Sequence, residues 1–587
     1  MNIEDYTPMK HSWEELDIYR GSLFTGEWPT IPELFEISLS RFPERNCFTT
    51  FDPERKTMSY KEVHGHLLRI SGYLQEAGFK KGDRVIINGK NSPQWGLAYL
   101  AVMFAGGVVV PLDNQMPQNR VTTLSCFCEA AFLFGDFDVI QRIPDDESWF
   151  RMLKGAFTLK GHSDRCPSIM DIQPKTIHEP PRCTCDDLAA ILFTSGTTGN
   201  EKGAMLTHAN IVSDVFQACD GIFLHVTEKD VLYALLPLHH SYCCTAVFLE
   251  AIKHGAECVF GHGIIVSRML NDMKQGQVTI FMGIPLLYNK LLAGLMKKVR
   301  ERGRFAYALI RSLMWINGIL KKTFHINPGR RWFKALLSGL GMDHNRICIC
   351  GAGPLSPKVF HQYQQLGLDF IQGYGLTETS PILTLNPISK FKIKSVGMCF
   401  PLVDMKIDEP DLFGVGEVLV KGPNICKGYY KDEANTKALF TDDGYLRTGD
   451  LGSMDKEKYL YLKGRAKNLI VTEGGKNVYP EEIEDLFQLY PQIDQILIRG
   501  YMEKKDLKAE GIEAVIHPSE EYFKDQALDS PEVRGEIEQI IHDINQKLVA
   551  YKKITRTTIL DKPMAMTSTK KIQRNKVLRT AQAILHM

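Results

Sequence analysis

Residues 192–210 read LFTSGTTGNEKGAMLTHAN, and this stretch decides how the rest of the chain is interpreted. An apolar run ends at Phe193 and is followed by a turn rich in hydroxyl side chains and glycine, and then by a helix-like segment. Glycines let backbone N–H groups converge on phosphate oxygens, hydroxyl groups donate further hydrogen bonds, and a lysine adds positive charge. The stretch therefore predicts a loop that binds a polyphosphate, formed by Thr194, Ser195, Gly196, Thr197, Thr198, Gly199, Lys202 and Gly203.

Two other classes of loop have a related composition. The lysine loop of P-loop nucleoside triphosphatases has the spacing G-x-x-x-x-G-K-[ST], which this run does not match. A solvated turn is the simplest interpretation of an isolated stretch rich in glycine, serine and threonine. The match is longer than such a turn requires, and the run resembles the phosphate loop of the adenylate-forming superfamily, which includes acyl-CoA synthetases, adenylation domains and beetle luciferases. The resemblance implies that the chain binds ATP and Mg²⁺.

Two downstream segments resemble the nucleotide pocket of this superfamily. They are GAGPLS at residues 351–356 and GYGLTETSP at residues 373–381. The resemblance implies that the Thr377 hydroxyl meets the α-phosphate and that Glu378, with Thr194, holds Mg²⁺, a cation usually bound by one or two carboxylates plus phosphates. It also implies an adenine pocket of small residues and one aromatic face, formed by Gly351, Ala352, Gly353, Gly373, Tyr374 and Gly375.

Three charged residues complete the resemblance. Asp450 in YLRTGDLG matches the aspartate that holds the ribose hydroxyls, and Arg465 in KGRAKNLI matches the arginine beside it. Near the C-terminus, PMAMTSTKKIQR resembles the segment P-x-T-x-x-G-K-I-x-R, which places the catalytic lysine at Lys571. Lys570 replaces the glycine of that segment, so two adjacent lysines compete for the role, although Lys571 keeps the spacing to the following isoleucine and arginine. Without the upstream motifs this basic run would be interpreted as a solvated tail.

The apolar segments alternate in a way that predicts an α/β fold. A strand is expected at residues 84–88, a helix at 94–105 and a buried strand at 108–112. Together they form a β-α-β unit, which implies parallel strands covered by helices. Further strands are expected at 231–236, 258–260 and 279–282.

The length of 587 residues predicts more than one domain, because a single core does not grow to this size. The resemblance implies a large multi-sheet N-terminal adenylate-forming domain, residues 1–463, and a small mobile α/β C-terminal domain, residues 464–587. It places the hinge at Lys467. In the C-terminal part, helices are expected at 481–489 and 533–548 and strands at 495–499 and 513–517.

Composition excludes few classes of protein. The chain has 44% hydrophobic and 24% charged residues, and its net charge of +1 gives no general argument for nucleic acid as a partner. The 14 cysteines include no C-x-x-C and no histidine at zinc spacing, so free buried thiols in a reducing compartment are expected. The N-terminus lacks the apolar core of a signal peptide, and proline and glycine interrupt the uncharged run at 92–112. The expected location is the cytoplasm, with membrane association as an open alternative.

The acid substrate is predicted from two neighbouring segments. PLHHSYCCT, residues 237–245, matches an aromatic and histidine segment at the acyl site of the superfamily, with His240 as the gate residue. The alternative for this segment is a strand end with core histidines. FMGIPLLY, residues 281–288, would supply an apolar wall.

Residues 297–346 form an unusual basic segment, with 12 lysines and arginines against two acids. At about 100° per residue, Phe305, Leu309, Leu313, Ile316 and Leu320 share one helical face, and Lys297, Arg300, Arg304 and Arg311 share the opposite face. Such a pattern is typical of an interfacial membrane helix, and an amphipathic helix packed on the domain with a solvated basic face is the equal alternative. The insertion resembles those of long-chain acyl-CoA synthetases, which favours a long-chain fatty acid and a peripheral membrane contact through this segment.

The leading hypothesis is an ATP-dependent ligase that converts a fatty acid to its acyl-adenylate and then to a coenzyme A thioester. A carboxylate reacts poorly with a thiol, because oxide would have to leave. Its attack on the α-phosphate of ATP replaces the oxide by a better leaving group. Mg²⁺, Lys571 and the loop donors would stabilise the charge that develops in this step. The nearest alternative transfers the acyl group to an acyl carrier protein. Two further alternatives are less consistent with the sequence. A nucleotide-binding module that has lost catalysis would not need Glu378, Asp450, Arg465 and Lys571 together. A protein that only binds membranes through the basic segment would leave the ATP motifs unexplained.

Overall fold

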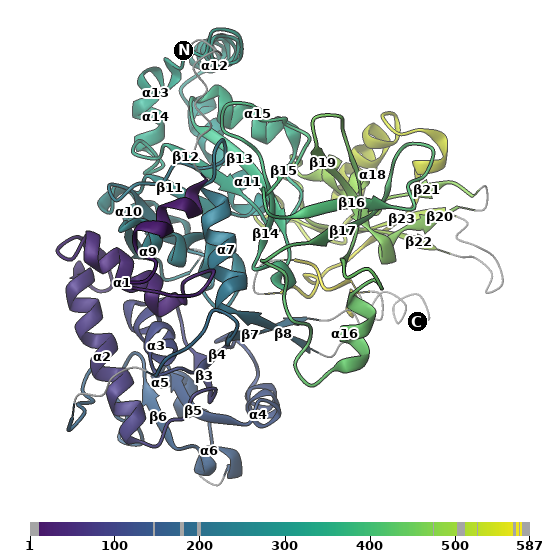
Figure 1. The fold of residues 1–587 in the computed structure, drawn as a ribbon. Helices are drawn as coiled ribbons and strands as arrows, with labels where there is room; N and C mark the ends of the chain where they lie inside the picture. The colour runs from purple at the N-terminus through teal and green to yellow at the C-terminus, as the bar shows by residue number, and fades with distance from the viewer. Residues whose placement is uncertain are drawn as a thin grey trace.

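The computed structural model describes residues 11–144, 147–176, 181–195, 201–263, 265–472, 475–501, 511–524, 526–567, 571–574 and 576–577. The fold is mixed α/β, with a large sheet-rich N-terminal part and a smaller C-terminal part (Figure 1). Its described strands form sheets of 13, six, three and two strands. The fold class expected from the sequence is therefore confirmed.

The six-stranded sheet carries the expected phosphate loop at its edge. Its strand order is β6-β5-β3-β4-β7-β8, and all its neighbouring strands are parallel except the pair β7 and β8. The strands are β3 Arg84–Asn88, β4 Val108–Pro111, β5 Ala130–Gly135, β6 Gly155–Thr158, β7 Leu188–Ser195 and β8 Glu201–Thr207. Helix α3, Pro93–Phe104, connects β3 to β4, so the predicted β-α-β unit is confirmed.

The 13-stranded sheet changes from parallel to antiparallel pairing at β13, Asp369–Gly375. On one side of β13 the order continues through β12, β11, β9, β10 and β1 in parallel, and on the other side it continues antiparallel through β14 to β16. The strands are β1 Asn46–Thr50, β2 Lys56–Ser59, β9 Val231–Ala234, β10 Glu257–Phe260, β11 Ile280–Gly283, β12 Ile347–Cys350, β14 Ile382–Leu385, β15 Gly397–Cys399, β16 Asp404–Asp408, β17 Gly416–Lys421, β18 Leu446–Met454 and β19 Tyr459–Arg465. Ligands of open α/β sheets bind outside the carboxyl ends of the strands, so the carboxyl end of β13 is a place to look for a site.

Helices cover the two large sheets, and several begin at capping boxes that fix their first turn. Thr30, Ser59 and Thr207 each accept a hydrogen bond from the backbone N–H three residues later while the side chain at that position bonds back. The longer helices are α1 Ile31–Arg41, α2 Tyr60–Glu76, α4 Gln118–Phe127, α7 His208–Ala218, α10 Val266–Gln275, α11 Pro285–Glu301, α12 Arg304–Phe324 and α15 Pro357–Gln365. One continuous apolar core, from Leu16 to Leu460, joins these helices except α4 to both sheets, and α4 packs into a separate cluster with Ile86, Val110 and Leu133.

The C-terminal part has an apolar core of its own, formed between Ile470 and Ile554. Its elements are β20 Ile470–Val471, β21 Asn477–Val478, α17 Pro480–Glu484, β22 Ile493–Tyr501, β23 Gly511–Pro518, α18 Pro531–Asn545 and β24 Ile554–Ile559. The expected helices and strands of this part are therefore present, with the first helix shorter than expected. The predicted domain boundary between residues 463 and 464 falls inside β19, and it remains a prediction.

Two local expectations are wrong. The polyphosphate loop does not lead directly into a helix, because strand β8 pairs with β7 before α7 begins. The basic segment is not one helix, because α11 ends at Glu301 and α12 begins at Arg304 after Gly303, whose φ of 103° only glycine adopts readily. Lys297 and Arg300 therefore belong to a different helix from Arg304 and Arg311.

Candidate active site

The residues singled out by the sequence gather around one cleft of about 3580 Å³ between the large sheet and the C-terminal part. The cleft also reaches the apolar segment before α11, where Met282, Ile284 and Leu286 line it. The predicted site residues that line it are Thr194, Lys202, His240, Gly351, Ala352, Gly353, Gly373, Tyr374, Gly375, Thr377, Glu378, Asp450, Arg465 and Lys571. Gly196, Thr197, Thr198 and Gly199 lie outside the described residues, and of Ser195 only the backbone position in β7 is described.

Asp450 is the centre of a hydrogen-bonded group formed by residues of β13, β18 and β19. Its Oδ1 pairs with Arg465 Nε at 2.8 Å, and its Oδ2 accepts a hydrogen bond from the Tyr374 hydroxyl at 2.6 Å. Asp450 and Arg465 are direct cross-strand partners on β18 and β19. Burial raises the pKa of Asp450, while Arg465, Tyr374 and Lys571 oppose the rise. The paired oxygens each keep a second lone pair, which suits hydroxyl donors such as those of a ribose.

The lining near β13 needs very small residues. A Cβ on Gly375 would lie 1.7 Å from the carbonyl oxygen of Pro381, and a Cβ on Gly351 would lie 2.9 Å from the Tyr242 ring. Ala352 adopts φ of 66°, which turns the backbone sharply after Gly351. The result is a shallow wall beside the Tyr374 ring, the shape that a flat base requires.

Glu378 lies in a single turn of 3₁₀ helix, Thr377–Thr379, directly after β13. The Tyr429 hydroxyl donates to Glu378 Oε1 at 2.8 Å, and burial together with the Glu378 charge raises the pKa of Tyr429, so the phenol stays protonated. Lys202 Nζ lies 5.0 Å from the centre of the Tyr429 ring and donates to Asn435 Oδ1 at 2.6 Å. Tyr429 therefore joins the carboxylate expected to hold Mg²⁺ to the lysine expected to bind phosphate.

Tyr429 and Asn435 were not predicted from the sequence. Tyr429 precedes the helix α16, Glu433–Leu439, on which Asn435 lies, and neither residue belongs to a Gly-rich or charged motif. Only the spatial return of this segment to β8, through an antiparallel bridge between Ala204 and Tyr429, brings them to the site.

Replacing Tyr429 by phenylalanine tests this contact. Because a hydrogen bond to a charged group contributes about 1.5–3 kcal/mol, Tyr429→Phe should lower the rate of acid-dependent pyrophosphate exchange about tenfold or more, with a raised KM for Mg-ATP. The neighbouring Tyr430 packs its ring against Phe127, so Tyr430→Phe is a matched control that should leave both parameters unchanged. Equal effects of the two substitutions would refute a specific role for the Tyr429 hydroxyl.

Lys571 is brought to the same cleft by the last described segment of the chain. Its backbone N–H donates to Thr567 Oγ1 at 3.1 Å, and the Thr567 N–H donates to the Lys571 carbonyl at 2.8 Å. The side chain keeps access to solvent through the open cleft, yet the surrounding protein and the Arg465 charge lower the pKa of Lys571, while Asp450 raises it. Lys571 thus lies within electrostatic range of the Asp450 and Arg465 pair. Lys570 lies outside the described residues.

His240 lines the cleft, whereas the adjacent His239 lies with its Nε2 3.8 Å from a carboxylate oxygen of Asp113. The two imidazole centres are 4.2 Å apart. Burial lowers the pKa of His240, and the neighbouring His239 and the Lys571 charge lower it further, so the imidazole is neutral. A neutral imidazole beside the apolar side of the cleft is better suited to act as a gate than to bind the substrate carboxylate as a cation.

Comparisons with known proteins agree with the geometry. Residues 35–430 match the family described as AMP-binding enzyme, and residues 467–585 match the AMP-binding enzyme C-terminal domain. The chain is 30% identical over 512 residues to long-chain-fatty-acid–CoA ligase 6 of Mus musculus, covering 80% of this chain and 72% of that protein. It is 28% identical over 457 residues to a feruloyl-CoA synthase of Amycolatopsis sp, covering 76% and 80%. Among solved structures, ATP-bound MatB from Rhodopseudomonas palustris has a TM-score of 0.74 at 25% identity, covering 95% of this chain and 100% of that chain.

Proposed function

The chain belongs to the AMP-binding enzymes, and from this premise we propose that it converts a long-chain fatty acid to its coenzyme A thioester. The coarser activity, adenylate-forming ligation of an acid to coenzyme A, follows from the family and its relatives. The observation that supports the site assignment is the convergence of Asp450, Arg465, Glu378 and Lys571 on one cleft that also has an apolar branch.

The first half-reaction is the attack of a carboxylate oxygen on the α-phosphorus of ATP, with pyrophosphate as leaving group. We assign Asp450 and Arg465 to the ribose and its surroundings, and the wall of Gly351, Tyr374 and Gly375 to adenine. Glu378, with the Thr194 hydroxyl, would hold Mg²⁺, which neutralises phosphate charge when bound. Lys571, Lys202 and Thr377 would stabilise the charge that develops on the α-phosphate oxygens.

The second half-reaction is the attack of the coenzyme A thiol on the acyl carbon of the adenylate, which releases AMP. We assign the change between the two steps to rotation of the C-terminal part about Lys467, which would withdraw Lys571 from the cleft. The acceptor is tested by incubating the protein with ATP, a fatty acid and either coenzyme A or a purified acyl carrier protein. A thioester formed only on the carrier protein would contradict the proposed acceptor.

The support for a long-chain acid comes from the outward face of α12. Among the apolar side chains that this face and the following turn expose are Phe305 at 84%, Trp315 at 62%, Phe324 at 61% and Ile326 at 57%. Helix α12 packs inward through Met314 and Asn317 instead. The apolar face is divided, because Phe305, Leu309 and Ile316 are exposed whereas Leu313 packs against the core and Arg311 lines the cleft. The alternative of a helix packed on the domain therefore remains a prediction.

We propose that this exposed face, here called the α12 patch, lies on an anionic lipid bilayer. Exposed basic residues surround it, and they are Arg302, Arg304, Lys322, Arg331 and Lys334. Aromatic and aliphatic side chains with a basic rim are the composition of interfacial helices. None of the described helices has the length and apolar character needed to cross a membrane. The patch would place the cleft beside the phase in which long acyl chains dissolve.

Charge reversal at Arg302, Arg304 and Lys322 should weaken binding to anionic vesicles about 10²-fold, since each basic residue near such a surface contributes about 1 kcal/mol. Arg300 and Arg311 are unsuitable for this test, because both line the cleft and Arg300 donates to the Tyr307 hydroxyl. Vesicle sedimentation across a salt series measures the effect, and reversal at Lys456, Lys458 and Lys524, which are exposed elsewhere, is the control. A stable dimer that buries the patch, or binding indifferent to these charges, would contradict the proposal.

A further inference from the structure

The acid-binding side of the cleft continues inward along one helical segment. After His240 the chain forms α8, Ser241–Cys243, then a π-helical stretch, Cys244–Leu249, and then α9, Glu250–His254. Tyr242, Ala246 and Glu250 all line the cleft. Short π-helical stretches inside helices frequently lie at functional sites. Glu250 follows His240 by ten residues, which is roughly 15 Å of helix.

The inner end of this branch is closed by apolar side chains and one carboxylate. Ala218 from the end of α7, Leu224 from the following loop and Ala246 line it, and all three are buried. Two of these side chains are methyl groups, so they leave room beside Glu250. The Glu250 side chain, at 1% exposure, also lines the cleft and is the charged group among these residues.

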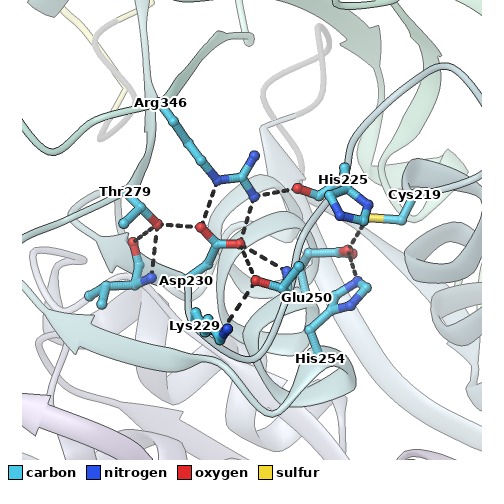
Figure 2. A network of polar contacts seen from close by, with 10 residues as sticks. Cys219, His225, Lys229, Asp230, Glu250, His254, Thr279 and Arg346 are labelled. Atoms are coloured by element: carbon cyan, nitrogen blue, oxygen red, sulfur yellow. Dashed lines mark hydrogen bonds and ion pairs between the residues drawn. The ribbon is translucent and has the colours of Figure 1, made fainter.

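Only one oxygen of the Glu250 carboxylate is used by the protein. Figure 2 shows Cys219 and His254 both directed at it, with Cys219 Sγ 2.8 Å and His254 Nε2 3.0 Å from Oε1. Among the described residues, Oε2 has no hydrogen-bond partner. Burial raises the pKa of Glu250, but the His254 hydrogen bond and the Lys253 charge outweigh it and leave the pKa below its usual value. A buried, ionised carboxylate thus presents a free oxygen.

The nearby Asp230 is a buried carboxylate with hydrogen-bond donors on both of its oxygens. Its Oδ1 accepts from Arg346 Nε and from the Thr279 hydroxyl, both at 2.7 Å, and its Oδ2 accepts from Arg346 Nη2 at 2.6 Å (Figure 2). Leaving a buried acceptor unpaired costs about 1–3 kcal/mol, and more for a charged group. Glu250 departs from the pattern of Asp230, because its buried Oε2 has no hydrogen-bond partner among the described residues although Glu250 lines the cleft.

We propose that Glu250 Oε2 accepts a hydrogen bond from the far end of the acid, so the substrate is an aliphatic acid with a hydroxyl group remote from its carboxylate. The inference rests on the proposed function and narrows its substrate class. Met282 and Ile284 would contact the apolar chain, and Glu250 would bind its polar end. A neutral donor fits better than an ammonium group, because the buried Lys253, whose Nζ lies over the Phe216 ring at 4.3 Å, already balances the carboxylate charge.

The test compares an ω-hydroxy fatty acid with the unsubstituted acid of the same length in acid-dependent pyrophosphate exchange. The unmodified protein should favour the hydroxy acid about tenfold or more in kcat/KM, since hydrogen bonds to charged groups are strong. Glu250→Gln keeps the shape of the side chain but replaces one acceptor oxygen by a donor, so the preference for the hydroxy acid should fall to about onefold. Glu250→Leu should reverse the preference. Cys219→Ser, which keeps a donor to Oε1, is the matched control and should keep the preference.

Two results would overturn the inference and leave the proposed function intact. One is pyrophosphate exchange in which the preference between the hydroxy acid and the unsubstituted acid is the same in the unmodified protein and in the Glu250 variants. The other is a divalent metal that the purified protein binds at one equivalent and that Cys219→Ala no longer binds. Donor atoms of Cys219, Glu250 and His254 lie within 4.8 Å of one another, so they could hold such a metal. The metal would then occupy Oε2 of Glu250. If no acid supports exchange, the proposed function itself fails. Calorimetric binding of the hydroxy acid to the unmodified protein and to Glu250→Gln then still decides whether Glu250 binds hydroxyl groups.

Discussion

Lys571→Ala should slow acid-dependent exchange of pyrophosphate into ATP by on the order of 10² or more, as the loss of one preorganised donor does in other active sites. Lys571 lines the cleft with Asp450 and Arg465, and its charge influences the pKa of both Asp450 and His240. A cation at this position is placed to stabilise charge on the α-phosphate and the attacking carboxylate as the new P–O bond forms. The measurement is the exchange rate at saturating acid and Mg-ATP.

Lys570→Ala is the matched control for this prediction. The two lysines are adjacent in the sequence, and the catalytic role is assigned to Lys571 only because of its spacing to the following isoleucine and arginine. Its exchange rate should stay within about twofold of the unmodified rate, as surface substitutions usually leave activity and stability little changed. Comparable losses in the two variants would show that the assignment of Lys571 is wrong. Thioester formation from supplied acyl-adenylate should be nearly unaffected in both.

Lys467→Pro should block thioester formation while adenylate formation continues. Lys467 is the second residue of a turn closed by the Leu469 N–H and the Ala466 carbonyl at 3.3 Å, a position where proline is favoured. Proline therefore fits the present domain arrangement, in which Lys571 lies in the cleft. If the domain rotation requires a backbone conformation at residue 467 that proline disfavours by about 3 kcal/mol, the population of the rotated arrangement would fall about 10²-fold.

Rapid-quench analysis of the two half-reactions checks the hinge. Acyl-adenylate should accumulate in Lys467→Pro to about one equivalent per protein molecule, and its conversion to thioester should be slow. Lys467→Ala, which removes the side chain but leaves φ free, should carry out both steps. If Lys467→Pro forms thioester from supplied acyl-adenylate at the unmodified rate, the hinge lies elsewhere.

Much of the fold could be predicted from the sequence because its main determinants are local. The strand β3 and the helix α3 were expected almost at their observed bounds, since a buried parallel strand and a helix rich in apolar residues differ clearly in length and flanking residues. The site residues Tyr374 and Asp450 were predicted in another way, from the resemblance of their segments to family motifs. Their roles in binding ATP remain proposals.

Features that depend on tertiary contacts were missed or misjudged. Tyr429 and Asn435 contribute through a bridge to β8, and no local pattern marks them. The apolar side of α12 was correctly recognised as one face, but periodicity does not say whether that face is packed or exposed. Helix α12 is held to its neighbours by contacts that include Asn317 to the Gln365 carbonyl at 3.0 Å and Lys321 to Asp369 at 2.8 Å, while Phe305, Leu309 and Ile316 remain exposed. Glu250 likewise has no motif, since its significance comes from burial and from one unpaired oxygen.

Attack of the acid on the α-phosphate of ATP transfers an oxygen of the acid to AMP, and isotopic labelling detects this transfer. A fatty acid with both carboxylate oxygens labelled with ¹⁸O is incubated with the protein, Mg-ATP and coenzyme A, and the nucleotide products are analysed by mass spectrometry. The proposed reaction breaks the bond between the acyl carbon and the bridging oxygen, so AMP should carry one labelled oxygen and pyrophosphate none. Unlabelled AMP, or ADP with labelled phosphate, would contradict the account.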